Sequence, residues 1–184
     1  MAAFVAAILA QATDRTSWLT AILASRFGRP GAVIAGTAIA LAFINALGAV
    51  AGALIGPRLT PNAQSLLLAF ALLSAGGSAL FLIKPPDRLS GWRIGPFLTS
   101  LSGVAILGFG DRTQFITAAL AARSPAPALA AVGATLGALV VNVPAILAGE
   151  EIRRKLPIAA LRFSIGPLFL VTGAFFGLSA LRLI

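Results

Sequence analysis

This sequence of 184 residues contains no cysteine, no histidine and no tyrosine. Without cysteine there are no disulfide bonds and no thiolate metal sites, and without histidine there are no imidazole ligands or imidazole proton relays. Acidic residues are scarce as well, because Asp and Glu together number 5 against 14 Lys and Arg. Metal or proton chemistry in this chain must therefore depend on a few carboxylates and on neutral oxygen groups.

Apolar residues dominate what remains. Hydrophobic residues make up 59% of the chain, charged residues make up 10%, and the mean hydropathy is +0.99. Soluble domains lie far from these values, whereas about 20 consecutive apolar residues suffice to cross a bilayer as a helix. The expected fold class is an all-α polytopic membrane protein with six transmembrane helices, over residues 3–24, 31–56, 64–83, 97–120, 127–149 and 158–181.

Three other classes of protein or segment are disfavoured. The net charge of +9 is scattered over short loops rather than gathered into a basic patch with aromatics, so we expect a lipid bilayer and not nucleic acid as the partner. The chain has no nucleotide-binding loop, which argues against direct coupling to ATP. Ala10-Gln11-Ala12 resembles the cleavage site of a signal peptide, but no basic residue precedes the apolar run, so an uncleaved first helix is favoured.

One tripeptide occurs twice inside apolar sequence, as Asp14-Arg15-Thr16 and Asp111-Arg112-Thr113. Shifting the chain against itself by the 97 residues that separate them (111 − 14) also aligns other polar or special residues without a gap. These aligned pairs include Thr20 with Thr117, Pro30 with Pro127, Gly36 with Gly133, Asn45 with Asn142 and Gly76 with Gly173. Matches of Ala and Leu are expected by chance in this composition, but coincident Asp, Asn and Pro indicate an internal duplication.

The duplication predicts the organisation of the chain. Residues 1–83 form a first three-helix repeat, residues 84–96 a cytoplasmic linker and residues 97–184 a second three-helix repeat. Because each repeat has an odd number of spans, the second copy enters the membrane from the opposite side and the repeats are inverted. Glycines at one-turn spacing in the second helix of each copy are expected to allow close helix packing: Gly48, Gly52 and Gly56, and Gly133 and Gly137.

Basic residues set the expected orientation. The connections 25–30, 84–96 and 150–157 share one face and carry eight Lys or Arg, against three on the other face. The positive-inside rule then places the richer face in the cytoplasm and both termini outside it. The predicted location is a bacterial-type inner membrane, with multiple passes.

Two aspartates need an explanation, because a charge near the bilayer centre costs about 2.5–3.5 kcal/mol on insertion scales. In an inverted repeat, Asp14 and Asp111 would meet near the midplane. Gly108 and Gly110 would loosen the fourth helix just before Asp111. Oxygen-bearing neighbours complete a candidate site of Gln11, Thr16, Thr113 and Gln114, with Asn45 and Asn142 on the following helices. Such hard ligands suit Mn²⁺, Ca²⁺ or Mg²⁺.

The residues Gln11-Ala12-Thr13-Asp14-Arg15-Thr16 and Gly108-Phe109-Gly110-Asp111-Arg112-Thr113 resemble the two Glu-x-Gly-Asp-(Lys/Arg)-(Thr/Ser) motifs of the Gdt-type cation/proton exchangers, in the lysine-exporter superfamily. The resemblance covers the whole chain and implies two inverted three-helix repeats. It also implies export of Mn²⁺ or Ca²⁺ from the cytosol in exchange for protons. The chain departs from the motif at its Glu, which is Gln11 in one copy and Gly108 in the other, and at its first Gly, which is Thr13 in the first copy.

The predicted function is therefore a secondary transporter and not an enzyme, with Asp14 and Asp111 binding the ion. The ion is the substrate, no cofactor is expected, and a homodimer is left open. Arg15 and Arg112 are expected to tune the charge of the site or to gate it, with Asn45 and Asn142 as outer neighbours.

Two alternatives remain open. In a transport-inactive or differently selective homologue, Asp14 would pair with Arg112 and Asp111 with Arg15, and the pairs would only fix helix packing. In an intramembrane aspartyl protease, Gly108-Phe109-Gly110-Asp111 would carry one of two catalytic aspartates. That enzyme hypothesis leaves the duplication unexplained.

Overall fold

A computed structural model describes residues 1–81, 84–155 and 157–183, except for the side chains of residues 152–154. The described residues fold into helices joined by short connections. In chain order these are α1 (Ala2–Ala12), α2 (Arg15–Phe27), α3 (Pro30–Ile55), the 3₁₀ turn η1 (Gly56–Arg58), α4 (Pro61–Leu80), α5 (Gly95–Gly108), α6 (Arg112–Ala122), α7 (Pro127–Lys155) and α8 (Ile158–Ala180).

Four helical segments are long and apolar enough to cross a membrane: Pro30–Arg58, Pro61–Leu80, Pro127–Glu151 and Ile158–Ala180. The shorter helices α1 and α5 are also apolar. The prediction of an all-helical membrane protein is thus confirmed at this level. The expected continuous spans over 3–24 and 97–120 are wrong, because each of these stretches contains two helices separated by a break.

Both breaks have the same local cause. Asp14 has extended backbone angles (φ −95°, ψ 158°), and its side chain accepts a hydrogen bond from the Thr16 backbone N–H at 3.0 Å. Asp111 is likewise extended (φ −74°, ψ 166°) and accepts from the Gln114 backbone N–H at 2.7 Å. Each aspartate therefore acts as the N-cap of a new helix, which hydropathy alone does not reveal. Gly110, with φ 75°, precedes the second cap, so the expected loosening before Asp111 is confirmed.

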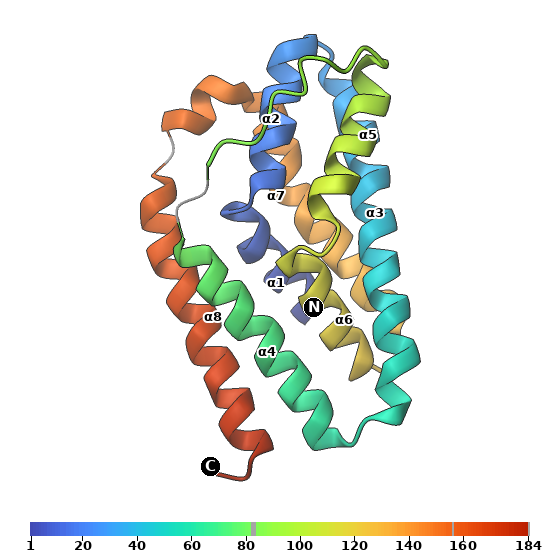
Figure 1. The fold of residues 1–184 in the computed structure, drawn as a ribbon, viewed down its shortest axis with the longest axis vertical. Coiled ribbons are helices and arrows are strands. Elements are labelled where there is room, and N and C mark those ends of the chain that lie inside the picture. The colour runs from blue at the N-terminus through green and yellow to red at the C-terminus, as the bar shows by residue number, and fades with distance from the viewer. Residues whose placement is uncertain (82–83, 156, 184) are drawn as a thin grey trace.

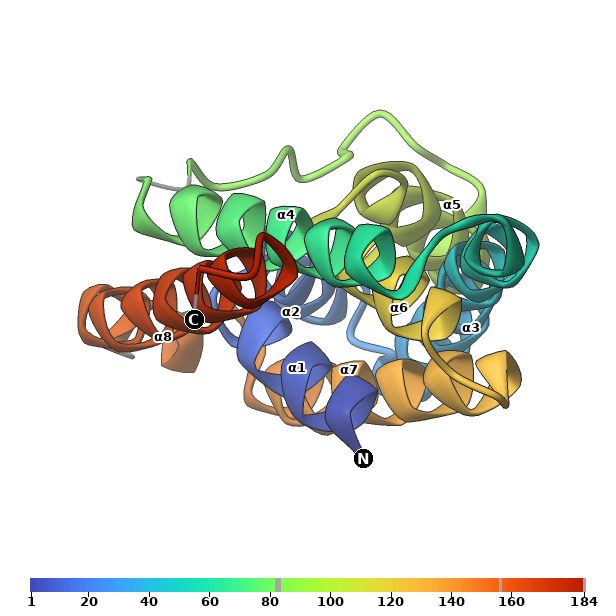
Figure 2. The same ribbon diagram turned by 90° about the horizontal axis from the view of Figure 1, so that it is seen from below.

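The helices pack in pairs that the 97-residue offset relates to each other. Helix α1 packs on α7, as its counterpart α5 packs on α3; α2 packs on α7, as α6 packs on α3. The long helices α3 and α7 also contact each other. Helices α4 and α8 run side by side at the edge of this group, as two views of the molecule show (Figures 1 and 2).

Glycines allow the closest of these approaches. A Cβ atom on Gly48 would lie 2.9 Å from the carbonyl oxygen of Gln114, and one on Gly52 or Gly56 would clash with the next turns of α6. Gly137 brings α7 equally close to the backbone of α1. These contacts agree with the packing role predicted for the glycine rows except at Gly133, where the nearest atom to a Cβ would lie at an ordinary 3.4 Å.

Helices α4 and α8 cross in a symmetric way. A Cβ added to Gly76 of α4 would lie next to Gly166 and Leu170 of α8. A Cβ added to Gly173 of α8 would lie next to Ala69 and Leu73 of α4. Adding 97 to Ala69 and Leu73 gives the residue numbers 166 and 170. The crossing therefore uses equivalent residues of the two predicted repeats.

The segment between the repeats is held at one end of the bundle (Figure 1). Arg26, in the last turn of α2, donates hydrogen bonds to backbone carbonyls of the segment, including that of Trp92 at 2.8 Å. Arg88 forms an ion pair with Glu150 at 2.8 Å, and the Glu150 backbone N–H donates to the Ser25 hydroxyl at 3.0 Å. The three connections that were expected to share one face therefore lie together.

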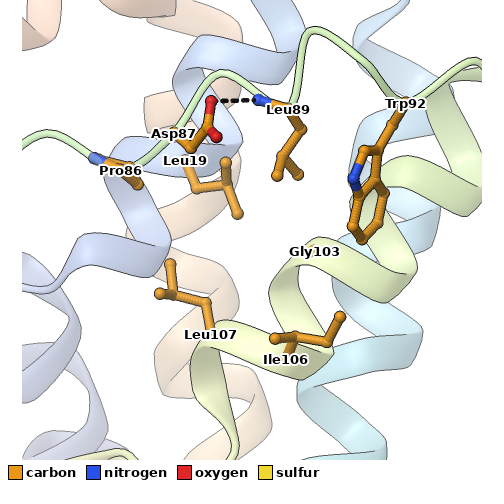
Figure 3. Close-up of a pocket in the computed structure, with 8 residues that line it drawn as sticks. All are labelled: Leu19, Pro86, Asp87, Leu89, Trp92, Gly103, Ile106 and Leu107. Carbon is orange, nitrogen blue, oxygen red and sulfur yellow. Dashed lines mark hydrogen bonds between the residues drawn. The ribbon is translucent and has the colours of Figure 1, made fainter.

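The same segment covers the neighbouring ends of α2 and α5. A Cβ on Gly103 of α5 would lie 2.8 Å from a methyl carbon of Leu89 and 3.4 Å from one of Leu19. These residues and Trp92 line a mainly apolar pocket of about 150 Å³ beneath the segment (Figure 3). Leu89 thus packs against both helices.

Candidate cation site at the two helix breaks

The site is formed where the break between α1 and α2 meets the break between α5 and α6. The guanidinium Nη2 of Arg112 lies 3.3 Å from Oδ1 of Asp14, and the two side chains are only 7% and 14% exposed. The carboxylates of Asp14 and Asp111 are near enough to repel each other, and Arg112 attracts that of Asp111 too. The structure therefore brings the two predicted aspartates together.

Gln11 connects the two breaks from the last turn of α1. Its side chain is fully buried, and its Nε2 donates to the hydroxyl of Thr113 at 3.1 Å and to Oδ2 of Asp111 at 3.5 Å. Its Oε1 accepts from Nδ2 of Asn142 at 3.1 Å. The residue that replaces the motif Glu in the first copy is thus bonded to the aspartate of the second copy.

The two asparagines make equivalent hydrogen bonds. Thr20 donates to Oδ1 of Asn142 at 3.2 Å, and Thr117 donates to Oδ1 of Asn45 at 3.3 Å. Thr20 and Thr117, like Asn45 and Asn142, are related by the 97-residue offset. All four side chains are buried. Each asparagine is therefore held by a threonine of the other predicted repeat.

Gln114 bonds to the backbone of its own break and to that of the neighbouring helix α3. Its Oε1 accepts from the Gly110 backbone N–H at 2.7 Å, and its Nε2 donates to the Ile44 carbonyl at 3.2 Å. Ser17, the equivalent residue of the first copy, donates to the carbonyls of Gln11 and Asp14, both at 3.0 Å. Both residues thus fix the shape of a break.

Several buried polar atoms close to the first break have no hydrogen-bond partner among the described residues. They include the hydroxyls of Thr13 and Thr16 and Nε of Arg112. Orphaned polar groups are costly in an apolar surrounding and are uncommon unless a water, an ion or a second conformation satisfies them. The predicted site residue Thr16 therefore offers an unused oxygen.

The two arginines of the duplicated tripeptide occupy different environments. Arg112 is buried and pairs with Asp14, whereas Arg15 is exposed. Across the part of the chain that the structure describes, no ion pair joins Arg15 to Asp111, so the expected second pair is not formed. The cause lies in the partners of Asp111, which are the amide of Gln11 and the cap of α6.

These groups define what the site can do chemically. The largely buried carboxyl groups of the two aspartates outnumber the one arginine beside them, which favours the approach of a cation when both are ionised. Amide and hydroxyl oxygens are ligands for hard divalent ions. Within the described ranges no three residues among His, Cys, Asp and Glu gather as a metal site, so the neutral oxygens would have to supply the remaining ligands.

Sequence reasoning missed four polar residues that the structure places in this network: Ser17, Thr20, Thr117 and Thr135. Thr135 accepts from Nδ2 of Asn45 at 3.3 Å. The duplication did align Thr20 with Thr117, but a hydroxyl in an apolar helix bonds its own backbone so often that the pair gave no sign of a partner. The match of Thr20 with Thr117 at the 97-residue offset is the signal that could have found that pair.

Comparison with known proteins decides the family. The family described as "Divalent cation/proton antiporter GDT1" matches residues 1–85 and 96–183, that is, nearly the whole chain. The chain belongs to this family. The GDT1 match also falls in two stretches that nearly coincide with the two predicted repeats.

A curated relative agrees with this assignment. A protein of Vibrio cholerae named "Putative manganese exporter" is 34% identical over 168 residues, which cover 89% of this chain and 82% of that protein. No solved structure matches this GDT1-family chain. Family and relative identify it as a multi-pass membrane protein of the divalent-cation transporter class, as predicted.

Proposed function

We propose that this protein exports Mn²⁺ or Ca²⁺ from the cytosol in exchange for protons, through the site between the two helix breaks. The observation that carries the proposal is the meeting of Asp14 and Asp111 at facing helix breaks inside apolar sequence. Discontinuous helices near the midplane are the usual place for ion sites in secondary transporters with repeats. The relative named as a manganese exporter favours Mn²⁺ among the hard divalent ions.

Each site residue has a proposed role. Asp14 and Asp111 bind the ion, the hydroxyls of Thr16 and Thr113 complete its coordination, and Gln11 orients Asp111 and Thr113 through its amide. Gln114 keeps the second break in shape rather than binding the ion, because its amide is bonded to backbone groups. Asn45 and Asn142 orient the inner residues, since Asn142 donates to Gln11. Arg112 tunes the charge of the site, whereas Arg15, which was expected to tune or gate it, is exposed and is given no part in ion binding.

The proposed mechanism needs two inverted repeats, 1–83 and 97–184, that rock against each other around this site. Equivalent helix pairs, equivalent Thr–Asn hydrogen bonds and the equivalent glycines of α4 and α8 support that arrangement. The linker 84–96 then faces the cytoplasm and both termini face the opposite side, as the positive-inside rule requires.

Proton exchange follows from the same carboxylates. A largely buried carboxylate that releases a metal ion is stabilised by taking up a proton. The metal ion and the proton therefore compete for Asp14 and Asp111. With only two acids at the site, the proposed exchange uses these two residues as the proton carriers. No other acid is within the network described above.

One observation favours a second function class. The ion pair between Arg112 and Asp14 is already formed, as it would be in a homologue that has lost transport or changed its selectivity. Such a protein would use the pair only to hold the breaks together. Transport measurements separate it from the exchanger.

The test is transport by the purified protein in liposomes that contain a metal-sensitive dye. Mn²⁺ and Ca²⁺ uptake is compared with and without a pH gradient, for the wild type and for Asp14→Asn and Asp111→Asn. We expect uptake that depends on the gradient and is lost in both variants. A folded wild type that moves neither ion would overturn the exchanger and favour the closed ion pair.

A further inference from the structure

The duplicated tripeptide places one arginine inside the site and the other outside it. Arg112 lies at the start of α6 with its guanidinium 3.3 Å from Asp14, whereas Arg15 lies at the start of α2 and is exposed. The sequence difference that accompanies this asymmetry is Gln11, whose counterpart is Gly108. The amide of Gln11 donates a hydrogen bond to Asp111, so an amide is the partner of that carboxylate. The carboxylate of Asp14 forms an ion pair with Arg112 instead.

The position of Arg112 conflicts with an ion in the site. An arginine stays protonated under all ordinary conditions, so loss of its proton cannot relieve the conflict. With Arg112 in place, a divalent ion bound by Asp14 and Asp111 would give the site a net charge of +1, and the ion would share Asp14 with the guanidinium. In a medium of low dielectric constant, two cations competing for one carboxylate repel strongly.

The bonding of Arg112 is also incomplete. Its Nη2 is 3.3 Å from Asp14, at the long end for a charge-assisted bond, and its buried Nε has no partner among the described residues. A guanidinium that was there only to lock the helices would be expected to use more of its five donors. The side chain is therefore held mainly by one carboxylate oxygen, and a cation of higher charge can take its place.

We propose that Arg112 is a tethered cation that occupies the Asp14 carboxylate in the empty site and is displaced from it when the divalent ion binds. This inference rests on the proposed function, because it assigns to one residue the task of weakening and releasing the transported ion. The returning guanidinium competes with the ion for Asp14 and so lowers affinity and speeds release. It also neutralises part of the site while no ion is present.

The test compares Arg112→Gln with Arg15→Gln, which removes the same charge from the equivalent position of the other copy. Equilibrium binding of ⁵⁴Mn²⁺ to purified protein gives the affinity, and liposome transport gives the turnover rate. We expect Arg112→Gln to bind Mn²⁺ at least tenfold more tightly and to turn over more slowly. Arg15→Gln should change affinity less than threefold, and Arg112→Lys, which keeps a positive charge, should stay close to the wild type.

A purely structural role of Arg112 predicts the opposite sign, because a disturbed site binds the ion less well. Unchanged or weaker Mn²⁺ binding by folded Arg112→Gln would overturn the inference. The proposed function fails separately, if the wild type itself neither binds nor transports Mn²⁺ or Ca²⁺.

A measurement on the wild type covers the case in which Arg112→Gln does not fold. Phenylglyoxal labels accessible arginines, and mass spectrometry reports the labelling of each peptide. We expect Mn²⁺ to increase the labelling of Arg112 and to leave that of Arg26, which is bonded to the linker carbonyls, unchanged. If Mn²⁺ binds and the labelling of Arg112 stays the same or falls, Arg112 is not displaced.

Discussion

The two helix breaks of this GDT1-family protein carry the same three residues and use them differently. At the first break Asp14 takes the guanidinium of Arg112, and at the second Asp111 takes the amide of Gln11 and the backbone of its own helix. The local cap is common to both, so the tripeptide determines where each helix restarts. The partner of each carboxylate comes from the other half of the chain, and there the residues Gln11 and Gly108 differ. The shared tripeptide thus gives both breaks the same N-cap, whereas the residues that differ between them decide which partner each carboxylate has.

The strongest test of this difference removes one carboxylate at a time. Asp14→Asn leaves the buried Arg112 without its acid and should lower the free energy of unfolding by about 3–5 kcal/mol. Asp111→Asn keeps a good N-cap and leaves the ion pair of Arg112 with Asp14 in place, so its cost should stay below about 1 kcal/mol. Both variants should lose transport. Denaturant unfolding in detergent measures the stability, and equal losses in the two variants would contradict the comparison.

A second test uses the equivalent glycines Gly36 and Gly133, which lie against the helices that lead into the breaks. A Cβ on Gly36 would lie 3.0 Å from the backbone N of Leu101 and closer still to the carbonyl of Phe97, whereas one on Gly133 has its nearest neighbour, the backbone N of Phe4, at 3.4 Å. Gly36→Ala should therefore destabilise by about 1–3 kcal/mol. Gly133→Ala should be nearly neutral, because Ala favours the helix by up to about 1 kcal/mol.

Thermal unfolding of the two alanine variants measures this difference directly. Gly77→Ala is the matched control for helix propensity, since nothing lies within 4 Å of a Cβ at that position. If Gly36→Ala were as stable as the control, the close approach of α3 and α5 would be wrong.

A third test restores the acid that the first copy lacks. Gln11→Glu would place a third carboxylate beside Asp111 and Thr113, where the Gln11 amide now lies 3.5 and 3.1 Å from them. We expect Mn²⁺ to bind about tenfold more tightly, which corresponds to about 1.4 kcal/mol. Gln64→Glu adds the same charge far from the breaks, next to Gly56, and should leave the affinity unchanged. Equilibrium binding of Mn²⁺ measures both affinities. If the two variants changed the affinity equally, Gln11 would not be part of the ion site.

The smallest expected loss of stability concerns the threonine–asparagine hydrogen bonds, which are equivalent in the two halves of the chain. Thr20→Val and Thr117→Val each remove one buried hydrogen bond to an asparagine, at 3.2 and 3.3 Å. Each should cost about 1 kcal/mol of unfolding free energy, and the two costs should agree within error. Clearly unequal losses in parallel denaturant titrations would show that the network is not symmetric in energy.

Much of this molecule was predictable from its residues. The apolar composition and the run lengths predicted the helices, and the GDT1 family match bears out the resemblance carried by the duplicated motif. The break before Asp111 was foreseen because Gly108 and Gly110 precede it. The break at Asp14 was not foreseen, because Thr13 is not a helix-breaking residue and the capping of α2 depends on a backbone turn that no composition shows.

The sequence by itself determined that the chain belongs in a membrane and that Asp14 and Asp111 stand out as charges of one tripeptide that occurs twice in apolar sequence, because hydropathy and spacing are properties of the residues alone. Only the tertiary structure decided which arginine enters the site, which asparagine meets which threonine and where Gln11 points. These choices depend on side chains about 100 positions apart meeting across helices, and in such contacts small differences of shape and charge select one partner over another.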